Sequence, residues 1–300
     1  MAISRNQLVK ELEPGLNALF GLEYKQYENQ AAEIYTTESS DRAFEEEVML
    51  SGFASARVKP EGSGVAFDNA QETFTARYTN ETIALAFAIT EEAIEDNLYD
   101  RLASRYTKAL ARSMASTKQV KGAATLNNGF GTFQSGDGVT LFSTAHPTIA
   151  GTFSNTLATA SDLNETSLEQ ALIDIAALTD ERGLKIAAKG VKMIIPSALQ
   201  FTAERLMKSQ GRVSTADNDI NAIRSMGMIP QGYRVNNYLT DTDAFFITTD
   251  VPNGMKHFNR APLTTKMEGD FDTGNVRYKA RERYVFGVSD PRGIFASPGA

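Results

Sequence analysis

One segment constrains the fold of this chain more than any other, because two strand-like stretches lead directly into a long helix. Residues 73–78 alternate, with Phe74, Ala76 and Tyr78 facing one way, and residues 83–89 alternate large apolar side chains with alanine. Thr90 can cap a helix of about thirty residues, roughly 45 Å long at 1.5 Å per residue. So elongated a unit cannot enclose its own apolar surface. The segment therefore predicts a protein whose sides contact partners.

The apolar residues of this predicted helix recur at every fourth position. Because an α-helix has 3.6 residues per turn, each step of four drifts by ~40° around the axis. The stripe therefore winds around the helix, which suits either a central core helix or a spine contacted by different elements along its length. Its members are Ile94, Leu98, Leu102, Tyr106, Leu110 and Met114.

Composition and charge exclude several classes of protein. The chain has 300 residues, no cysteine and a net charge of -7. The missing cysteines exclude disulfides, thiolate zinc sites and cysteine nucleophiles. The negative charge argues against a dedicated nucleic-acid binder, but suits a surface that lies near nucleic acid without binding it. No apolar run approaches the ~18 residues of a membrane span. The first residues lack the apolar core of a signal peptide, so we expect the chain to stay in the cytosol until released.

The N-terminal part is predicted to consist of an arm and a hairpin. In residues 1–47, Pro14-Gly15 favours a break between two short helices. The acidic run at 45–47 predicts a solvated face or a strip that docks on a basic neighbour. Residues 48–79 indicate a hairpin in which 48–58 is weakly strand-like and Lys59–Gly64 forms the flexible tip.

The remainder indicates a mixed α+β unit followed by long strands. Gly122–Gly138 is predicted to be a breaker region between two domains. Residues 166–169 match a capping box, whose helix should stop near Gly183. From Met255 the pattern returns to strands. We also expect a strand at 191–195, a helix at 197–209 and strands at 233–235, 244–248 and 276–286.

The strand at 276–286 carries four basic residues on one face. Lysines and arginines along a strand commonly protect the edge of a sheet from pairing with other chains. They can equally meet the acidic arm of a neighbouring copy. Both interpretations apply to Arg277, Lys279, Arg281 and Arg283.

A search for chemistry yields no catalytic residue, no cofactor-binding residue and no metal ligand. His146 and His257 lie far apart, and His146 is expected to make a local hydrogen bond. Gly129-Phe130-Gly131 lacks the third glycine of a dinucleotide fingerprint and follows a helix instead of a strand. Residues 217–221 mimic a calcium loop without its glycine and glutamate, so they predict a polar loop with a helix cap. We therefore expect that the chain is not an enzyme.

The layout resembles a known family of shell proteins. The segments that carry the resemblance are Leu85–Asp100, Gly122–Phe130 and Leu141–Pro147, followed by Asn155 and the helix at 166–169. They are similar to the major capsid protein of tailed phages, with the Hong Kong 97-type fold. The Mu-like major head subunit group is the most similar.

The resemblance implies an α+β fold with five parts. Residues 1–47 would be the N-terminal arm, 48–82 the extended hairpin loop, and 83–138 a peripheral domain with the spine helix. Residues 139–254 would be the axial domain, and 255–300 the C-terminal strands of the peripheral domain.

The implied function is a head protein that assembles with itself through hexamers and pentamers into an icosahedral shell. That shell would enclose double-stranded DNA without sequence-specific binding and without a membrane. Assembly would occur in the host cytoplasm, with scaffolding, portal and decoration proteins as further partners. An encapsulin-like compartment and, from another class, a soluble α+β enzyme are the alternatives.

Overall fold

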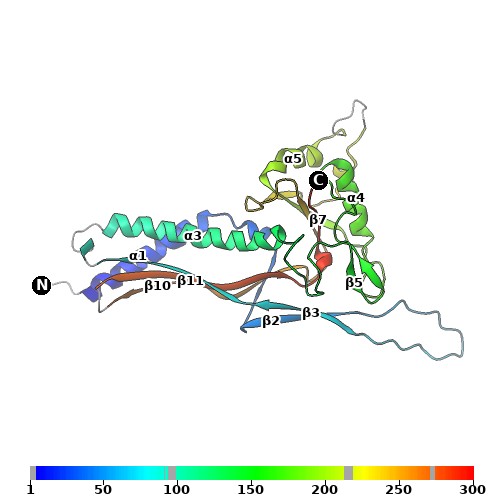
Figure 1. Cartoon of the computed structure of the whole chain (residues 1–300), viewed down its shortest axis with the longest axis horizontal. Helices are drawn as coiled ribbons and strands as arrows, with labels where there is room; N and C mark the ends of the chain where they lie inside the picture. Colours follow the sequence, from blue (N-terminus) through cyan, green and yellow to red (C-terminus); the bar gives the residue numbers. More distant parts are fainter. Residues whose placement is uncertain (1–4, 91, 94–98, 213–218, 271–273) are drawn as a thin grey trace.

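The protein consists of an elongated part, a compact part and a projecting hairpin (Figure 1). The computed structural model describes the whole chain except residues 1–4, 91, 94–98, 213–218 and 271–273, and the side chains of 5–12 and 99–102 are likewise not described. The C-terminus lies in the compact part.

The elongated part is built on a four-stranded sheet with the order β1-β10-β11-β4. Strands β10 (Met255–Gly269) and β11 (Val276–Val288) form a long antiparallel pair. Strand β4 (Glu81–Ile89) flanks β11, and β1 (Thr36–Ser39) runs parallel to β10. The arm therefore contributes a strand to this sheet.

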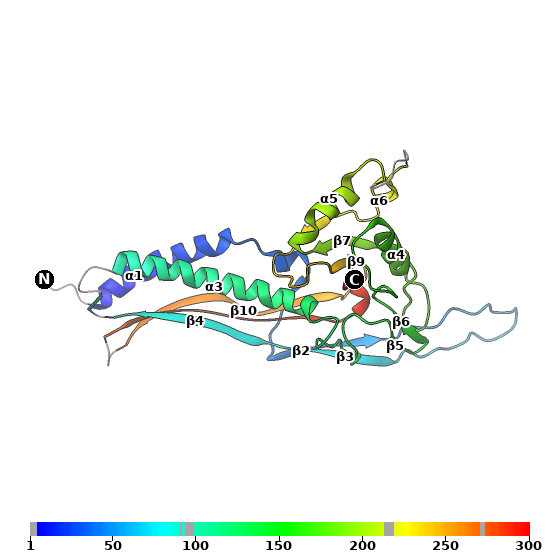
Figure 2. The ribbon, with the colours of Figure 1, turned by 45° about the horizontal axis from the view of Figure 1, so that its top comes forward.

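Two helices cover one face of this sheet. Helix α1 (Arg5–Gln26) and helix α3 (Tyr99–Asn127), the spine helix, run side by side in both ribbon views (Figure 2). Alternate residues of β11 point towards them because successive side chains of a strand face opposite sides. The buried cluster between the layers includes Leu16, Phe20, Leu110, Met114, Met267, Val276 and Tyr278.

Three members of the stripe predicted for the spine helix have described side chains. Tyr106 is half-exposed, whereas Leu110 and Met114 are buried. The expected cap is also present, because the hydroxyl of Thr90 accepts a hydrogen bond from the Ala93 amide at 3.4 Å. Ile94, Leu98 and Leu102 lie outside the described side chains.

Two predictions about helix breaks were wrong. Pro14 lies inside α1, which continues to Gln26. Buried Leu16 and Phe20 anchor the turns that follow this proline, and tertiary packing commonly overrides local propensity. Gly122 lies inside α3, where an added Cβ atom would approach the Cβ of Ala31 to 2.6 Å. This glycine permits close packing of the residue 30–33 turn on the helix, and the helix ends only at Asn127.

The compact part contains a second sheet with the order β12-β9-β7-β8. Its strands are β7 (Gly190–Ile195), β8 (Tyr233–Val235), β9 (Phe245–Thr249) and β12 (Ile294–Ser297). The C-terminal strand thus pairs with β9 and not with the long strands. Helices α4 (Glu165–Ala176), α5 (Gln200–Lys208) and α6 (Ala222–Met226) surround this sheet, with 3-10 turns at Gln30–Glu33, Ser197–Leu199 and Pro291–Gly293 elsewhere in the chain.

Helix α4 begins two residues earlier than predicted. Asn164 is its N-cap and accepts from the Ser167 amide at 2.8 Å, while the Ser167 hydroxyl accepts from the Asn164 amide at 3.0 Å. The capping box therefore uses Asn164 and Ser167, since serine at the third helical position can reach back as glutamate does. Asn221 caps α6, which confirms the helix cap expected after the polar loop. Residues 217 and 218 of that loop lie outside the described part.

The hairpin is formed by β2 (Phe44–Leu50) and β3 (Glu72–Thr79). It starts earlier than predicted, and the connecting segment 51–71 is longer than the expected tip because strand pairing ends at Leu50. This segment projects past the compact part (Figure 1). A short hairpin of β5 (His146–Thr148) and β6 (Gly151–Phe153) lies near its root.

Candidate assembly surfaces

The root of the projecting hairpin is fixed by a buried polar network. The ammonium of Lys256 pairs with the carboxylate of Glu47 and, at 3.1 Å, with that of Glu38. Burial alone would lower the pKa of Lys256, but its hydrogen bonds to Glu47 and Glu38 outweigh this and raise it. Ser289 donates to Glu47, and Tyr78 therefore donates to Ser289. The network joins the hairpin to β1, β10 and the end of β11.

The ring of Tyr78 provides the apolar contacts at the root of the hairpin. It meets the ring of Phe258 edge-on, with centroids 4.9 Å apart, and lies directly over Gly287. A Cβ atom on Gly287 would approach the Tyr78 ring to 2.5 Å. The hairpin therefore depends on a glycine in the adjacent long strand.

Gly287→Ala should destabilise the subunit by about 1–3 kcal/mol, because overpacking forces a buried side chain to shift. Urea denaturation measures this difference. Gly131→Ala is the matched control, since nothing lies within 4 Å of its Cβ position and its φ is not positive. Equal stability of both variants would mean that Tyr78 is not held against β11.

Beyond its root, the hairpin exposes large apolar side chains. Val58 is 94% exposed and Phe67 is 98% exposed, so neither packs against its own subunit. Arg182 of the compact part restrains the segment by donating to the backbone oxygen of Asn69 at 2.6 Å. Hydrogen bonds from the amides of Ala54 and Asn69 lower the pKa of Asp68, which lies beside Arg182. A soluble subunit rarely exposes such groups together unless they meet a partner.

The basic residues of β11 lie on the open face of the long sheet. The prediction that these residues protect the edge of a sheet is wrong, because β11 is a central strand that pairs with β10 on one side and with β4 on the other. Arg277 pairs with Asp270. Within the described residues, Lys279 and Arg281 form no ion pair within 4 Å, and both are exposed. Opposite them β4 presents only small side chains, and on the β10 side Glu268 and Asp270 lie among the basic residues.

The acidic run of the arm is used mainly within its own subunit. Glu47 binds Lys256, Glu45 accepts from the Ser40 hydroxyl at 2.8 Å, and Glu46 lies 3.7 Å from Arg77. These contacts do not favour the interpretation of the run as a free docking strip. Its carboxylates instead help to close the hairpin root.

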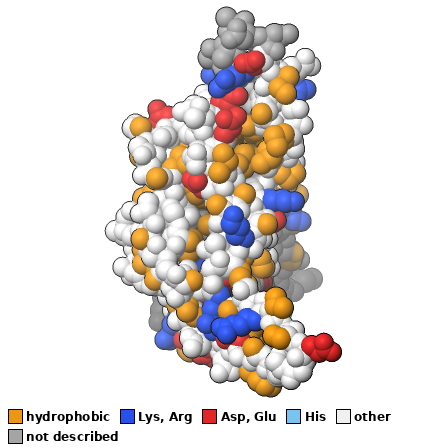
Figure 3. Space-filling view, turned by 90° about the vertical axis from the view of Figure 1, so that its right-hand side faces the viewer, with side chains coloured by type: hydrophobic (Ala, Val, Ile, Leu, Met, Phe, Trp, Pro, Cys, Tyr) orange, Lys and Arg blue, Asp and Glu red, His pale blue; other side chains and the backbone are white. Residues whose placement is uncertain are grey.

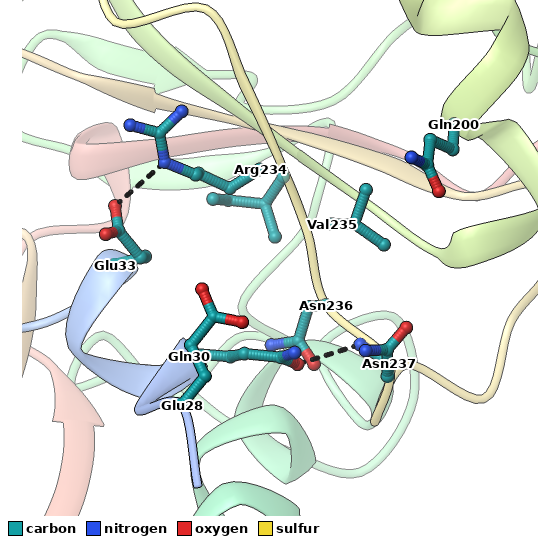
Figure 4. A pocket seen from close by; sticks show the side chains of 9 residues that line it. Glu28, Gln30, Glu33, Gln200, Arg234, Val235, Asn236 and Asn237 are labelled. Carbon is teal, nitrogen blue, oxygen red and sulfur yellow. Dashed lines mark hydrogen bonds and ion pairs between the residues drawn. The ribbon is translucent and has the colours of Figure 1, made fainter. Parts of the chain in front are cut away.

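A polar cavity of about 250 Å³ lies where the arm meets the compact part (Figure 4). Glu33 points to Arg234 at 3.4 Å and binds the ammonium of Lys192 at 2.7 Å, and the hydrogen bond from Lys192 lowers its pKa. Gln30 accepts from the amide of Asn237 at 2.9 Å. Glu33 is thus paired with two cations, and the described residues of the cavity present no nucleophile beside a base, so its geometry suits a joint between two parts of the fold.

The two histidines are separate and buried. His146 lies 2.6 Å from Asp137 and 3.1 Å from Asn155, so the expected local hydrogen bonding is confirmed. His257 stacks on Phe286 beneath the spine helix. Within the described ranges, no three His, Asp or Glu side chains gather to hold a metal ion. None of the helices that the structure describes combines the length and apolar character needed to cross a membrane.

His257 should make the subunit less stable in acid. Burial, and secondarily the charge of Lys118, lowers its pKa to about 4. Because the unfolded chain binds the proton at a pKa of about 6.5, stability is complete above that value and falls as the pH approaches 4, by about 3 kcal/mol in full. Denaturation of wild type and His257→Phe between pH 7 and 4.5 measures this. Burial raises the pKa of the nearby Glu282, which makes the subunit more stable as the pH falls. The readout is therefore the difference in free energy of unfolding between wild type and His257→Phe at each pH, because Glu282 is present in both. Parallel curves would contradict the prediction.

The architecture defines the fold class, which is an α+β fold of the Hong Kong 97 type. A capsid subunit of Myoviridae phage XM1 has a TM-score of 0.52 at 11% identity, with 89% of each chain covered. The procapsid subunit of bacteriophage JBD30 has a TM-score of 0.55 at 15% identity, covering 98% of this chain and 76% of its own. A virus-like particle from Pyrococcus furiosus has a TM-score of 0.55 at 10% identity, covering 95% and 98%.

The sequence itself identifies the family. Residues 72–297 match the family described as phage capsid protein, so the chain belongs to the phage capsid protein family. No curated protein matches it. Family membership confirms the predictions of a capsid protein and of a structural, non-enzymatic role, and the alternative of an enzyme was wrong.

Proposed function

We propose that this chain is the major head subunit, which assembles through hexamers and pentamers into an icosahedral shell around double-stranded DNA. The observation that carries this proposal is the projecting hairpin: its root is fixed by the Lys256 network, while Val58 and Phe67 have no partner in their own subunit. A rigid root with an unpartnered apolar tip supports a segment that reaches over an adjacent copy.

The parts of the fold then take separate roles. In this proposal residues 1–47 are the arm, 48–82 the reaching loop, and 83–138 with 255–300 the peripheral domain. Residues 139–254 form the axial domain near the capsomer centre. Strand β12 is the exception within 255–300, because it joins the sheet of the axial domain. The polar joint at Glu33 supports a fixed angle between the two domains.

The proposed contents and partners follow from charge and assembly. A net charge of -7 suits a shell that holds DNA without binding particular sequences. Scaffolding, portal and decoration proteins are proposed partners, with assembly in the host cytoplasm. We place the chain in the Mu-like major head subunit group on the segments Leu85–Asp100 and Leu141–Pro147. An alignment of that group lacking both segments would contradict this placement.

Electron microscopy of the purified chain, alone and with a scaffolding protein supplied, tests the proposal. Closed particles or discrete hexamers and pentamers are expected. A monomer under every condition would overturn it.

An encapsulin-like compartment is the second candidate, favoured by the likeness to the virus-like particle across almost both chains. The contents of particles isolated from the producing cells decide between the two. Nuclease-protected DNA supports a phage head, whereas a stoichiometric protein cargo without DNA supports a compartment.

A further inference from the structure

The compact part carries an apolar groove of about 320 Å³ between α4 and α6. Leu172 and Ile223 are buried at its floor, whereas Ile173 and Met226 are 61% and 70% exposed at its rim. Figure 3, which faces the α4 end of the molecule, shows hydrophobic side chains gathered beside acidic ones in this region. An open groove with exposed apolar rims is typical of a contact site. Its lining is Glu169, Leu172, Ile173, Ala176, Ala222, Ile223, Met226 and Met228.

A second apolar feature lies on α5 of the same compact part. Phe201 is 72% exposed, while Ala203 and Leu206 on the other side of the helix are buried. Arg205 and Lys208 follow at four and seven residues, so both lie on the face of Phe201. Lys208 pairs with Glu204 at 2.8 Å, which leaves Arg205 as the cation beside the protruding ring. We call this exposed ring and its neighbouring cation the knob.

The charges around the groove and the knob are complementary. Helix α4 contains acidic residues and no lysine or arginine. Glu165 is paired with Arg212, but Glu169 at the groove forms no ion pair within 4 Å among the residues described. Arg205 on the knob likewise makes only a long hydrogen bond to Thr202, at 3.4 Å, within the described part. An apolar groove flanked by negative charge therefore matches an aromatic ring flanked by positive charge.

The groove and the knob do not satisfy each other within one subunit. Helix α5 packs beside α6, yet Phe201 is 72% exposed and therefore does not fill the groove of its own subunit. Two different, complementary patches on one molecule produce a head-to-tail contact, and such contacts close into rings when the rotation permits. A second copy of the same chain is therefore the occupant that the surface fits.

We propose that Phe201 of each copy inserts into the α4–α6 groove of the next copy, with Arg205 facing Glu169, and that this contact closes the capsomer ring. The inference rests on the proposed shell function and adds the residues of its central contact. Buried aromatic side chains at the centre of an interface commonly dominate its binding energy.

Directed cross-linking tests the contact, because the chain has no cysteine of its own. Chains with Ala198→Cys, an exposed position one turn before Phe201, and chains with Ile173→Cys are co-expressed, assembled and oxidised, and the products are separated without reductant. Covalent dimers are expected in the mixture and not with either variant alone, since the contact places the turn before Phe201 of one copy beside position 173 of another. Reduction with dithiothreitol should remove them.

Two substitution series give an independent readout. Phe201→Ala should raise the dissociation constant of isolated capsomers about 30-fold by sedimentation velocity, whereas the control Ile149→Ala on the β5–β6 turn should not. Arg205→Glu should weaken the capsomer, and adding Glu169→Arg should restore it.

The outcomes separate this inference from the proposed function. If the wild-type chain forms shells but the paired cysteine variants give no cross-linked dimers, or Glu169→Arg fails to rescue Arg205→Glu, the head-to-tail contact is overturned and the shell function stands. Absence of any assembly by the wild-type chain would overturn both.

Discussion

Subunits in which Val58, Val65 and Phe67 are all replaced by serine should remain folded and lose the ability to form shells. These side chains are exposed in the subunit, so each substitution should change the free energy of unfolding by no more than about 0.5 kcal/mol. Burying each against a neighbour contributes roughly 1.5–3 kcal/mol. Together they should weaken each hairpin contact by about 4 kcal/mol or more, which is roughly a thousandfold.

Electron microscopy and sedimentation velocity measure assembly, while thermal denaturation of the unassembled subunit measures folding. Val120→Ser on the spine helix is the control, because it removes an exposed apolar side chain away from the hairpin. Normal shells from the triple variant would show that the hairpin does not reach a neighbour. An unfolded triple variant would place the hairpin inside its own subunit's core.

Replacing Arg292 by methionine should cost about 3–5 kcal/mol of subunit stability, because it leaves two buried carboxylates without their cation. The guanidinium donates to Glu181 at 2.7 Å, to Asp290 at 3.3 Å and to the carbonyl of Thr179 at 2.7 Å. It also lies 4.1 Å from the ring centroid of Phe153. This one side chain therefore links the loop after α4 to the segment before β12.

The pH dependence of this loss identifies its cause. Burial already raises the pKa of Asp290, and removing Arg292 should raise it further. A group with a raised pKa stabilises the fold when protonated, so the deficit should shrink as the pH falls from 7 towards 5. Urea denaturation at several pH values measures this. The E181Q/D290N/R292M variant should recover much of the loss, whereas a deficit that is the same at every pH would mean that lost packing dominates.

Local alternation and helical periodicity predicted most elements, because each depends on neighbouring residues. The strand at 276–286 was predicted from alternating side chains, and the spine helix from apolar residues at every fourth position, of which Leu110 and Met114 are buried. The position of β11 in the middle of its sheet was missed, since its partners β10 and β4 are chosen by long-range packing. Arg277 to Arg283 therefore suggested an edge that does not exist.

The candidate surfaces were predictable only in part. The hairpin and its flexible tip were visible as strand and turn residues, and the absence of catalytic motifs pointed to assembly. The polar network at the hairpin root could not be predicted, because its members come from three distant segments of the chain: Glu47, Lys256 and Ser289. The groove and knob of the compact part were missed for a different reason: exposed Phe201 and Ile173 have the same helical spacing as core residues.

A mechanical consequence follows from the way the hairpin joins the long sheet. Only Asn80 separates β3 from β4, and its amide donates to Ser40 and to the carbonyl of Arg42 at 2.8 and 3.0 Å. Residues 72–89 thus form one nearly continuous extended segment of about 60 Å. Tension applied at the tip would run along β4 and load its ladder with β11 in shear, so many hydrogen bonds would resist together. If the hairpin tip holds an adjacent copy as proposed, a force that pulls the two copies apart would be resisted by the β4–β11 ladder of the subunit that contributes the hairpin.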